Sequence, residues 1–270
     1  MKNVFFIDYM GTKYQESRKQ LINYDFTKYK TVVECFGGSF GFSRFLYKFK
    51  NMKDTEYIIY DADKKLIELY QTIQTDPKKY LDEYHLIRED LLNKFGDTAN
   101  MEKYKITTPL IVASPKMKEY LKNTNCSECV QSWILRAIEN TKWNKLPQKR
   151  VDEDFMDMIQ NVKFIHNSFN LEELEKYDKE TTLIYLDPPY LSAFNATYQV
   201  CGNNNIFVDI QTLLGKYDAM FVHSFDPLLD YFLKEYSRIR YPKRYNSKGG
   251  QIDHLIYSNM SIFDEFKKEA

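Results

Sequence analysis

The sequence predicts a protein of the α/β class, with a mainly parallel sheet that is interrupted by a helical insert. Strand-like apolar runs alternate with helix-like runs between residues 31 and 73. Helical patterns dominate from residue 77 to 161, and the alternation returns at residue 162. Alternation on both sides of a helical block is typical of parallel strands joined by crossover helices. We therefore expect residues 1–76 and 162–270 to form one domain and residues 77–161 to form a second.

The first domain is expected to begin with two strand–helix units. Residues 31–34 (Thr-Val-Val-Glu) and 57–60 (Tyr-Ile-Ile-Tyr) are strand-like. Helices are expected at 42–49 and at 64–73, where apolar residues recur at helical spacing. A further helical stretch follows Gly11-Thr12-Lys13.

The insert is expected to contain helices at 77–95, 116–122, 127–139 and 152–160, with 109–112 as its best strand candidate. Beyond it, strands are expected at 162–166, 182–186, 219–223, 237–241 and 254–257. The last two runs leave no room for a crossover helix between them. We therefore expect them to pair antiparallel.

Composition is that of a globular chain, with 270 residues, 43% hydrophobic and 28% charged. The formal net charge is zero, which argues neither for nor against nucleic acid as a partner. Any basic surface must therefore be local.

The four cysteines, at positions 35, 126, 129 and 201, do not form the pattern of a secreted disulfide scaffold. The first eight residues are too short and too soon acidic for a signal peptide. No apolar run approaches the roughly 18 residues of a membrane span. We expect a reducing, cytoplasmic location and no membrane partner.

Residues 187–190, Asp-Pro-Pro-Tyr, end the apolar run 182–186. Each proline lacks an N–H donor and has a fixed φ, so the strand cannot continue through them. The chain must leave the sheet there, with a carboxylate and an aromatic ring held on a stiff turn. That edge of an open α/β sheet is where ligands bind.

A glycine-containing loop, Phe36-Gly37-Gly38-Ser39-Phe40-Gly41, follows the strand at 31–34. Glycines after a strand allow a sharp turn and a close approach to a ligand, although many such turns are simple connectors. The next strand ends at Asp61, about twenty residues further on, where an acid is placed to accept hydrogen bonds from a ribose. A helix N-cap is the alternative interpretation of Asp61.

In this order, the motifs resemble the D12 class of adenine-specific DNA methyltransferases, to which the Dam enzymes belong. The resemblance includes Gly11-Thr12-Lys13, the loop from Phe36, the segment 60–70, Asp-Pro-Pro-Tyr and the tail from Lys243 to Asn259. It implies a Rossmann-like methyltransferase sheet that uses S-adenosylmethionine and releases S-adenosylhomocysteine. The helical insert matches least and is implied to be the target-recognition domain.

The resemblance implies a role for each matching residue at the cofactor. Lys13 would reach the methionine carboxylate, Phe36 and Phe169 would cover the two faces of the cofactor's adenine, and Asp61 would bind the ribose hydroxyls. The full set of implied cofactor residues is Tyr9, Lys13, Phe36, Gly37, Gly38, Ser39, Asp61, Phe169 and Asp187. Two positions depart from the family pattern: Phe40 replaces a glycine, and Ser168 stands where an acid is frequent.

The chemistry expected at Asp187 follows from the acceptor. An exocyclic amine on adenine is a weak nucleophile, because its lone pair is delocalised into the ring. The Asp187 carboxylate and the Pro188 carbonyl would accept its two N–H bonds and aim the lone pair. Pro189 would stiffen the turn, and Tyr190 would stack on a base flipped out of the duplex. No metal is needed.

Two alternatives stay open at the level of sequence. Asp-Pro-Pro-Tyr does not separate adenine N6 from cytosine N4, or DNA from an RNA or modified-base acceptor. The departures at Phe40 and Ser168 would also fit a non-catalytic DNA-binding protein that retains the fold.

Two basic segments are expected to face double-stranded DNA, because cations mixed with aromatic and amide groups suit phosphate contact. They contribute Lys142, Lys145, Lys149 and Arg150 at the end of the insert and Arg240, Lys243, Arg244 and Lys248 near the final hairpin. Solvated loops are the plainer interpretation. A restriction endonuclease is the protein partner that this class of enzyme suggests, whereas the oligomeric state and the bacterial or viral origin are open.

The remaining candidates are weak. Cys126 and Cys129 have zinc-like spacing but no second Cys/His pair nearby, so no metal site is expected. Trp133 lies on the apolar face of the predicted helix 127–139 and is expected to belong to the core of the insert.

Overall fold

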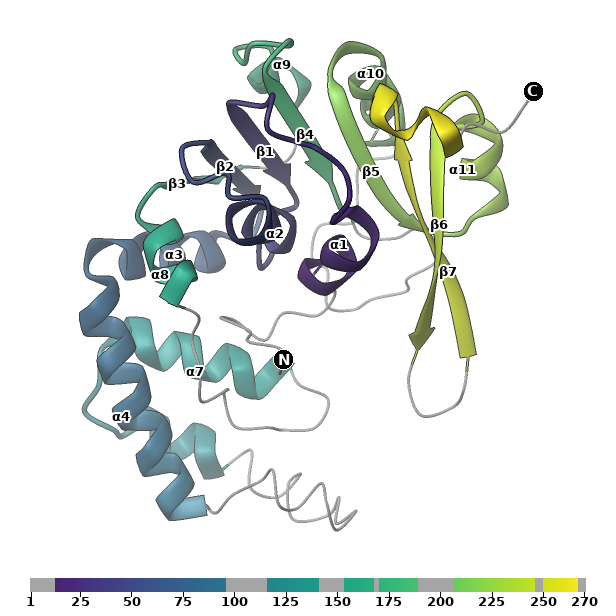
Figure 1. Cartoon of the computed structure of the whole chain (residues 1–270). Helices are drawn as coiled ribbons and strands as arrows, with labels where there is room; N and C mark the ends of the chain where they lie inside the picture. The colour runs from purple at the N-terminus through teal and green to yellow at the C-terminus, as the bar shows by residue number, and fades with distance from the viewer. Residues whose placement is uncertain are drawn as a thin grey trace. The chain divides into compact units, whose positions relative to one another are not determined.

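The computed structural model describes residues 13–95, 116–140, 153–167, 170–188, 206–245 and 250–266. The chain divides into two compact units (Figure 1). One is built from Lys13–Lys64 and Val162–Ala270, and the other contains Lys65–Asn161.

A seven-stranded sheet organises the first unit, in the order β3-β2-β1-β4-β5-β7-β6. Its strands are β1 (Thr31–Cys35), β2 (Glu56–Asp61), β3 (Val162–His166), β4 (Thr182–Leu186), β5 (Asp218–Ser224), β6 (Ser237–Tyr245) and β7 (Gly250–Ser258). Neighbours among β1 to β5 pair parallel, whereas β7 is antiparallel to both β5 and β6. The predicted α/β class, Rossmann-like sheet and antiparallel final pair are therefore confirmed.

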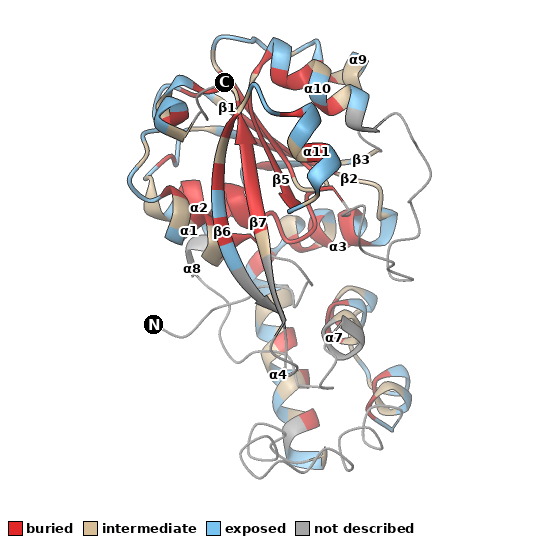
Figure 2. Ribbon diagram, turned by 90° about the vertical axis from the view of Figure 1, so that its right-hand side faces the viewer, coloured by how far each residue is buried: buried red, intermediate tan, exposed pale blue. Residues whose placement is uncertain are grey.

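The central strands are buried on both faces, which explains their nearly continuous apolar sequences (Figure 2). One face packs against α9 (Leu171–Leu174), α10 (Ile206–Lys216) and α11 (Pro227–Phe232) through a cluster that includes Val33, Ile184 and Leu213. The other face packs against α2 (Gly41–Phe49), where the Phe42 ring stacks on Tyr185 with centroids 4.1 Å apart.

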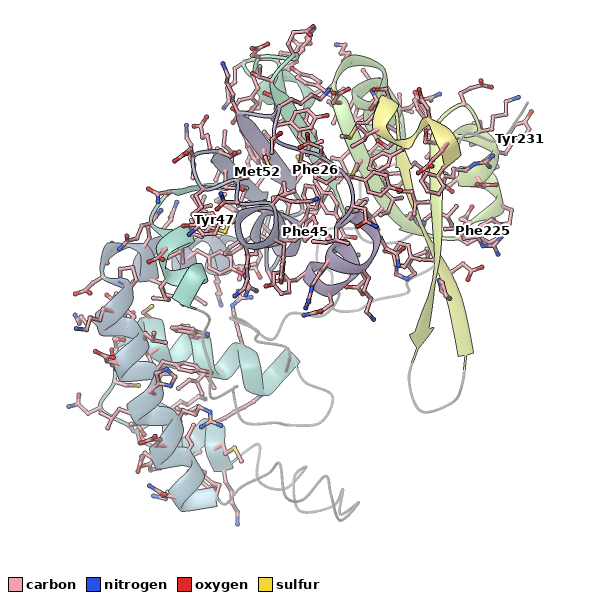
Figure 3. All side chains as sticks on the ribbon, viewed as in Figure 1. Phe26, Phe45, Tyr47, Met52, Phe225 and Tyr231 are labelled. Atoms are coloured by element: carbon pink, nitrogen blue, oxygen red, sulfur yellow. The ribbon has the colours of Figure 1, made fainter. Side chains whose placement is uncertain are left out.

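Aromatic residues occupy both the interior and the rim of this unit (Figure 3). Phe26 and Phe45 are fully buried, whereas Phe225 and Tyr231 are 40% and 66% exposed. Helix α1 (Tyr14–Leu21) packs against α2 and buries Leu21. The unit therefore has helices on both faces of its sheet, as parallel strands require.

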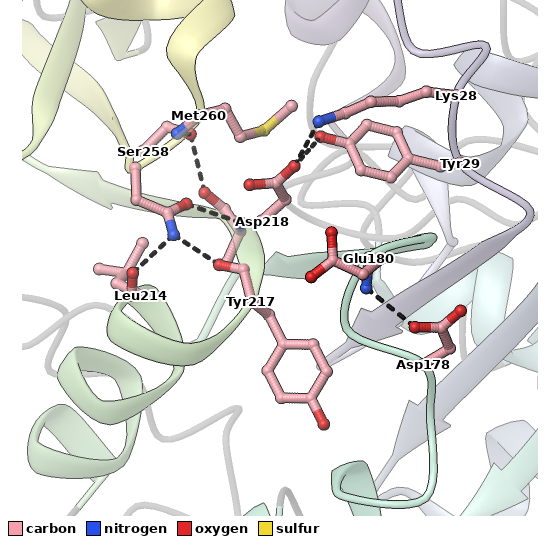
Figure 4. Close-up of polar contacts among 11 residues, drawn as sticks. Lys28, Tyr29, Asp178, Glu180, Leu214, Tyr217, Asp218, Ser258 and Met260 are labelled. Carbon is pink, nitrogen blue, oxygen red and sulfur yellow. Dashed lines mark hydrogen bonds and ion pairs between the residues drawn. The ribbon is translucent and has the colours of Figure 1, made fainter.

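A group of polar contacts stabilises the edge of the sheet where the parallel strands begin, at the opposite end from the loops that follow β1, β2 and β4 (Figure 4). The Asp218 carboxylate accepts hydrogen bonds from Lys28 Nζ at 2.6 Å and from Tyr29 OH at 2.7 Å. The Asn259 side chain accepts from Ala219 N at 2.9 Å and donates to two backbone carbonyls between residues 214 and 217. These contacts join the start of β5 to segments distant in sequence.

The second unit is helical over its described part. It contains α3 (Lys64–Thr75), α4 (Pro77–Phe95), a helix at 116–122, α7 (Glu128–Asn140) and α8 (Glu153–Ile159). Trp133 is 1% exposed and stacks on Tyr84 with ring centroids 4.3 Å apart, which confirms its place in the core. Gln74 Nε2 donates to the Ile159 carbonyl at 2.7 Å and so links α3 to α8. No described helix is long and apolar enough to cross a membrane.

Most predicted elements appear at their expected positions; the short helix α9 before β4 was not predicted, and the other differences lie after β4. Strands β6 and β7 are longer than the apolar runs that predicted them. Their antiparallel pairing continues past these runs as far as Tyr245, which lies opposite Gly250. Helices α10 and α11 were not predicted. For α11 the signal was present: Asp226 caps the helix and Pro227 occupies its first turn. The strand candidate at 109–112 lies outside the described residues.

Candidate active site

The carboxyl ends of β1, β2 and β4 meet at one edge of the sheet. Cys35, the last residue of β1, is in register with Tyr60 of β2 on one side and with Leu186 of β4 on the other. Phe36 and Asp187, which follow β1 and β4, and Asp61, the last residue of β2, therefore emerge side by side. Three sequence motifs separated by up to about 150 residues thus converge on the edge where open α/β sheets bind ligands.

The loop after β1 is tightly constrained. Phe36, Gly38 and Phe40 all have positive φ values, of 61°, 50° and 38°. Gly37 N donates to the Tyr60 carbonyl at 2.8 Å, and a Cβ at Gly37 would lie 2.2 Å from Ile59 Cγ2. Only glycine fits at position 37, because its backbone rests directly on β2.

Phe40, which departs from the family pattern, has the left-handed conformation that favours glycine. Its backbone lies at φ 38° and ψ 49°, at the N-cap of α2. The side chain is fully buried and meets Phe164 edge-on, with ring centroids 5.5 Å apart. A left-handed residue costs about 1–2 kcal/mol, and burial of a phenyl ring contributes about 1.5–3 kcal/mol. The packing of the ring thus offsets the backbone strain, and the loop keeps its turn without the glycine.

Glu34 is a buried acid that the sequence did not indicate as a site residue. Its carboxylate accepts hydrogen bonds from Ser43 Oγ at 2.6 Å, Ser43 N at 2.9 Å and Phe42 N at 3.4 Å. Burial, with a smaller contribution from the charge of Asp187, raises the pKa of Glu34 to about 7 against the lowering effect of these hydrogen bonds. Glu34 therefore anchors the start of α2 below the loop. In the sequence, the feature that could have predicted this role is an acidic residue within an otherwise apolar strand.

Asp61 connects two of the loops at this edge. Its Oδ2 accepts from Gly38 N and its Oδ1 from Asp63 N, both at 2.8 Å. The hydrogen bond from Asp63 N forms a local turn before α3. This turn is close to the helix N-cap that was the alternative interpretation of Asp61. The first contact aligns the glycine loop with the end of β2.

Asp187 lies at the end of β4 and is paired with Lys13. Lys13 Nζ is 2.5 Å from Asp187 Oδ2, and the two side chains are 5% and 18% exposed. Burial alone would lower the pKa of Lys13, but the charge of Asp187, assisted by Tyr241 and by the hydrogen bond, outweighs burial and raises that pKa. Pro188 is buried directly after Asp187. From the sequence, Lys13 was expected to reach the cofactor, whereas its ion pair with Asp187 was not predicted.

Among the predicted cofactor residues, Ser39 is buried. Several other predicted site residues lie outside the described part of the chain. The structure does not describe Tyr9, Lys142, Lys145, Lys149, Arg150, Phe169, Pro189, Tyr190 or Lys248. Lys243 and Arg244 lie on β6, without described side chains. Arg240 is described on β6, where its Nε donates to Asp253 Oδ2 at 2.6 Å and its guanidinium lies 5.3 Å from the centre of the Phe225 ring.

No group of three or more potential metal ligands occurs among the described residues. Within the same part of the chain, Cys35, Cys126 and Cys129 are free thiols. The groups that converge at the sheet edge are thus a carboxylate–ammonium pair, a second carboxylate and a loop of backbone N–H groups.

The fold and this edge define an α/β methyltransferase. More particularly, the chain belongs to the D12 class of N6 adenine-specific DNA methyltransferases, whose family model matches residues 9–228. The protein is therefore a site-specific DNA methyltransferase that acts on N6 of adenine, and membership of the family implies S-adenosylmethionine-dependent chemistry.

Similar solved structures include two rRNA methyltransferases. One is an rRNA methylase from Streptococcus thermophilus, with 10% identity, a TM-score of 0.37, and coverage of 91% of this chain and 96% of that chain. Another is the rRNA methyltransferase aviRa from Streptomyces viridochromogenes, with 10% identity, a TM-score of 0.35, and coverage of 94% and 84%. Similarity at this level carries no argument about substrate. No curated protein sequence matches the chain.

Proposed function

We propose that this protein transfers a methyl group from S-adenosylmethionine to the N6 amine of adenine in double-stranded DNA and releases S-adenosylhomocysteine. The observation that carries the proposal is the position of Asp187. Its carboxylate emerges from β4 beside the glycine loop of β1 and is paired with a buried ammonium. A hydrogen-bond acceptor for an amine and a loop suited to bind a cofactor thus lie at the same edge of the sheet.

The residues at this edge fit S-adenosylmethionine. The backbone from Phe36 to Gly38 turns tightly, and Gly37 has no room for a Cβ because Ile59 lies against it, which holds the loop beside the end of β2. Asp61 is the last residue of the neighbouring strand, where its carboxylate would accept hydrogen bonds from the ribose hydroxyls while it accepts one from Gly38 N. Phe36, Ser39 and Asp61 would hold the cofactor, together with Tyr9 and Phe169. When bound, the cofactor supplies an electrophilic methyl group on its sulfonium.

Asp187 would act on the acceptor amine. Its carboxylate and the Pro188 carbonyl accept the two N–H bonds, which directs the nitrogen lone pair toward the methyl group. Lys13 keeps Asp187 ionised and oriented, because an ammonium at 2.5 Å favours the charged carboxylate. The ammonium has three donors, so Lys13 can also meet the methionine carboxylate as the resemblance implies. Pro189 and Tyr190 would stiffen the turn and stack on the flipped base.

DNA recognition is proposed to come from the insert and the final hairpin. Residues 77–161 would form the target-recognition domain, and the catalytic domain would comprise 1–76 and 162–270. Phosphate contacts would come from the two predicted basic segments, which include the exposed residue Arg240 on the edge strand β6. We further propose a cytoplasmic location and, as protein partner, a restriction endonuclease that cleaves the same unmethylated site.

The decisive experiment compares Asp187→Asn with the wild-type protein. The variant should lose methyl incorporation into DNA by at least about a hundredfold, because the loss of a preorganised electrostatic contact costs that much. Binding of S-adenosylhomocysteine, measured by calorimetry, should change little. Equal loss of both would contradict the role assigned to Asp187.

The modified nucleoside identifies the acceptor. After digestion of the methylated DNA, mass analysis should find N6-methyladenine. Finding N4-methylcytosine instead, or methylation of RNA only, would show that adenine in DNA is not the substrate. Failure of the wild-type protein to bind S-adenosylhomocysteine would favour a DNA-binding protein without catalysis.

A further inference from the structure

The edge strand β6 carries a buried tyrosine that no role above uses. Tyr241 is 4% exposed, although its neighbours Arg240 and Pro242 are both exposed. Its ring meets the ring of His254 on β7, with centroids 5.6 Å apart, and His254 is fully buried. Tyr241 therefore points from the edge of the sheet into the interior of the unit.

The sheet register fixes which face Tyr241 occupies. Phe221 of β5 belongs to the core that packs against α10 and α11. Side chains alternate along a strand, so Ser224, three residues further on, faces the opposite side of the sheet. Ser224 pairs with His254 of β7, and His254 pairs with Tyr241 of β6. Tyr241 thus lies on the face opposite α10 and α11.

The pair of Lys13 and Asp187 is reached from that same face. Helix α2 covers it, with the Phe42 ring stacked on Tyr185. Helix α1, which begins directly after Lys13, packs against α2. Lys13 therefore approaches Asp187 from the side of the sheet to which Tyr241 points.

Tyr241 lies close enough to Lys13 to affect its charge. Burial lowers the pKa of Lys13, whereas the charge of Asp187 and then Tyr241 raise it. Both Lys13 and Tyr241 are buried, so water screens their interaction little. An ammonium has three donors and a phenolic oxygen is an acceptor, so the Tyr241 hydroxyl can take a hydrogen that Asp187 leaves.

We propose that Tyr241 is a positioning residue for methyl transfer, which confines the Lys13 ammonium against Asp187 from strand β6. This inference rests on the proposed function, in which Asp187 accepts the hydrogen bonds of the acceptor amine. Arg240, a proposed phosphate contact, is the next residue on the strand and points to the other side. Strand β6 therefore serves DNA binding through one face and the orientation of Asp187 through the other.

Tyr241→Phe tests the proposal, because it removes the hydroxyl and keeps the ring. The kcat for methyl transfer to double-stranded DNA should fall about tenfold, since a small displacement of a positioned group slows the reaction. The KM for DNA and the affinity for S-adenosylhomocysteine should stay within about twofold of wild type, because ground-state binding is unchanged. In a Lys13→Met background the same substitution should cause no further loss, because Tyr241 acts through Lys13.

Tyr257→Phe is the matched control. Tyr257 is a fully buried tyrosine of the paired strand β7, but its hydroxyl donates to Asp230 Oδ1 at 3.4 Å, next to α11. This variant should keep kcat within about twofold of wild type. A wild-type kcat in Tyr241→Phe would overturn the inference, as would an equal fall in both tyrosine variants. A further tenfold loss in the Lys13→Met background, on the order expected for independent sites, would also overturn it.

Hydrogen exchange of the Lys13 ammonium tests the contact without turnover. NMR of isotopically labelled lysine follows the exchange, and Lys13→Arg identifies the resonance by its loss. Tyr241→Phe should accelerate exchange by at least about tenfold, because exchange requires the buried group to open to water, whereas Tyr257→Phe should not. Unchanged exchange in Tyr241→Phe, or wild-type exchange as fast as that of exposed lysines, would overturn the inference. Accelerated exchange in Tyr241→Phe, with a wild-type protein that methylates no DNA, would contradict the proposed function alone.

Discussion

Lys13 and Asp187 form a buried ion pair at 2.5 Å although 174 positions separate them in the sequence. The pair joins the residue before α1 to the first residue after β4. It connects the segment that resembles a cofactor-binding motif with the one that resembles the catalytic motif. The positions of the two motifs are thus coupled by a single contact.

Removing the ammonium should affect both stability and activity. Lys13→Met is expected to lower the free energy of unfolding by about 3 kcal/mol, because it leaves a largely buried carboxylate without its partner. Methyl transfer should fall by at least about a hundredfold. Denaturant unfolding and incorporation of labelled methyl groups measure the two effects. Lys28→Met, at the exposed Lys28–Asp218 pair, is the control and should change stability by less than about 1 kcal/mol. A Lys13→Met protein as active as this control would contradict the prediction.

At position 40, a glycine variant should be more stable than an alanine variant, which reverses the order usual in a helix. Phe40→Ala is expected to destabilise the fold by about 3–5 kcal/mol, since it empties a buried aromatic site. Phe40→Gly should be about 1 kcal/mol more stable than Phe40→Ala, because only glycine adopts φ 38° without strain. Chemical denaturation of the two variants gives the difference directly. An alanine variant as stable as the glycine variant would show that the left-handed conformation is not maintained.

Two glycines should respond oppositely to alanine. Gly37→Ala would place a Cβ 2.2 Å from Ile59 and should weaken both folding and cofactor binding. Gly215→Ala has open space around its Cβ within α10 and should stabilise the fold by about 0.5–1 kcal/mol. Thermal unfolding and titration with S-adenosylhomocysteine test the pair. The prediction is wrong if Gly37→Ala binds as tightly as Gly215→Ala.

The buried Glu34 should make stability depend on pH. The pKa of its carboxyl group is about 7 in the folded protein, compared with an ordinary value of 4.5. Between these values the folded state binds more protons than the unfolded state, so this contribution to stability falls as pH rises from 4.5 to 7 and then levels off. The loss amounts to about 3 kcal/mol. Glu34→Gln removes the titration, so its stability relative to wild type should rise over this window in urea unfolding measured at several pH values. A constant difference between the two proteins would refute the shift.

Local sequence was enough to predict most of the fold. The strands at 31–35, 56–61 and 182–186 appear as apolar runs because these parallel strands are buried on both faces, whereas the edge strand at 162–166 alternates buried and exposed residues. Helix α4 was predicted at its observed bounds, since its period and its Pro77 start are local signals. Helix α10 was missed although a signal was present, since Ile210, Leu213, Leu214 and Tyr217 recur at helical spacing and are buried in one cluster.

The sequence by itself determined where the strands end, because glycine and proline act on their own backbone: Gly37 permits a close turn, and Pro188 stops the ladder after Asp187. Only the tertiary structure decided what those ends contact. It paired Asp187 with Lys13, placed Glu34 under α2, gave Phe40 a left-handed backbone supported by Phe164, and packed Tyr241 against His254. Backbone preferences act within a few residues, whereas the partner of a buried charge or ring depends on which distant segments the sheet order brings together.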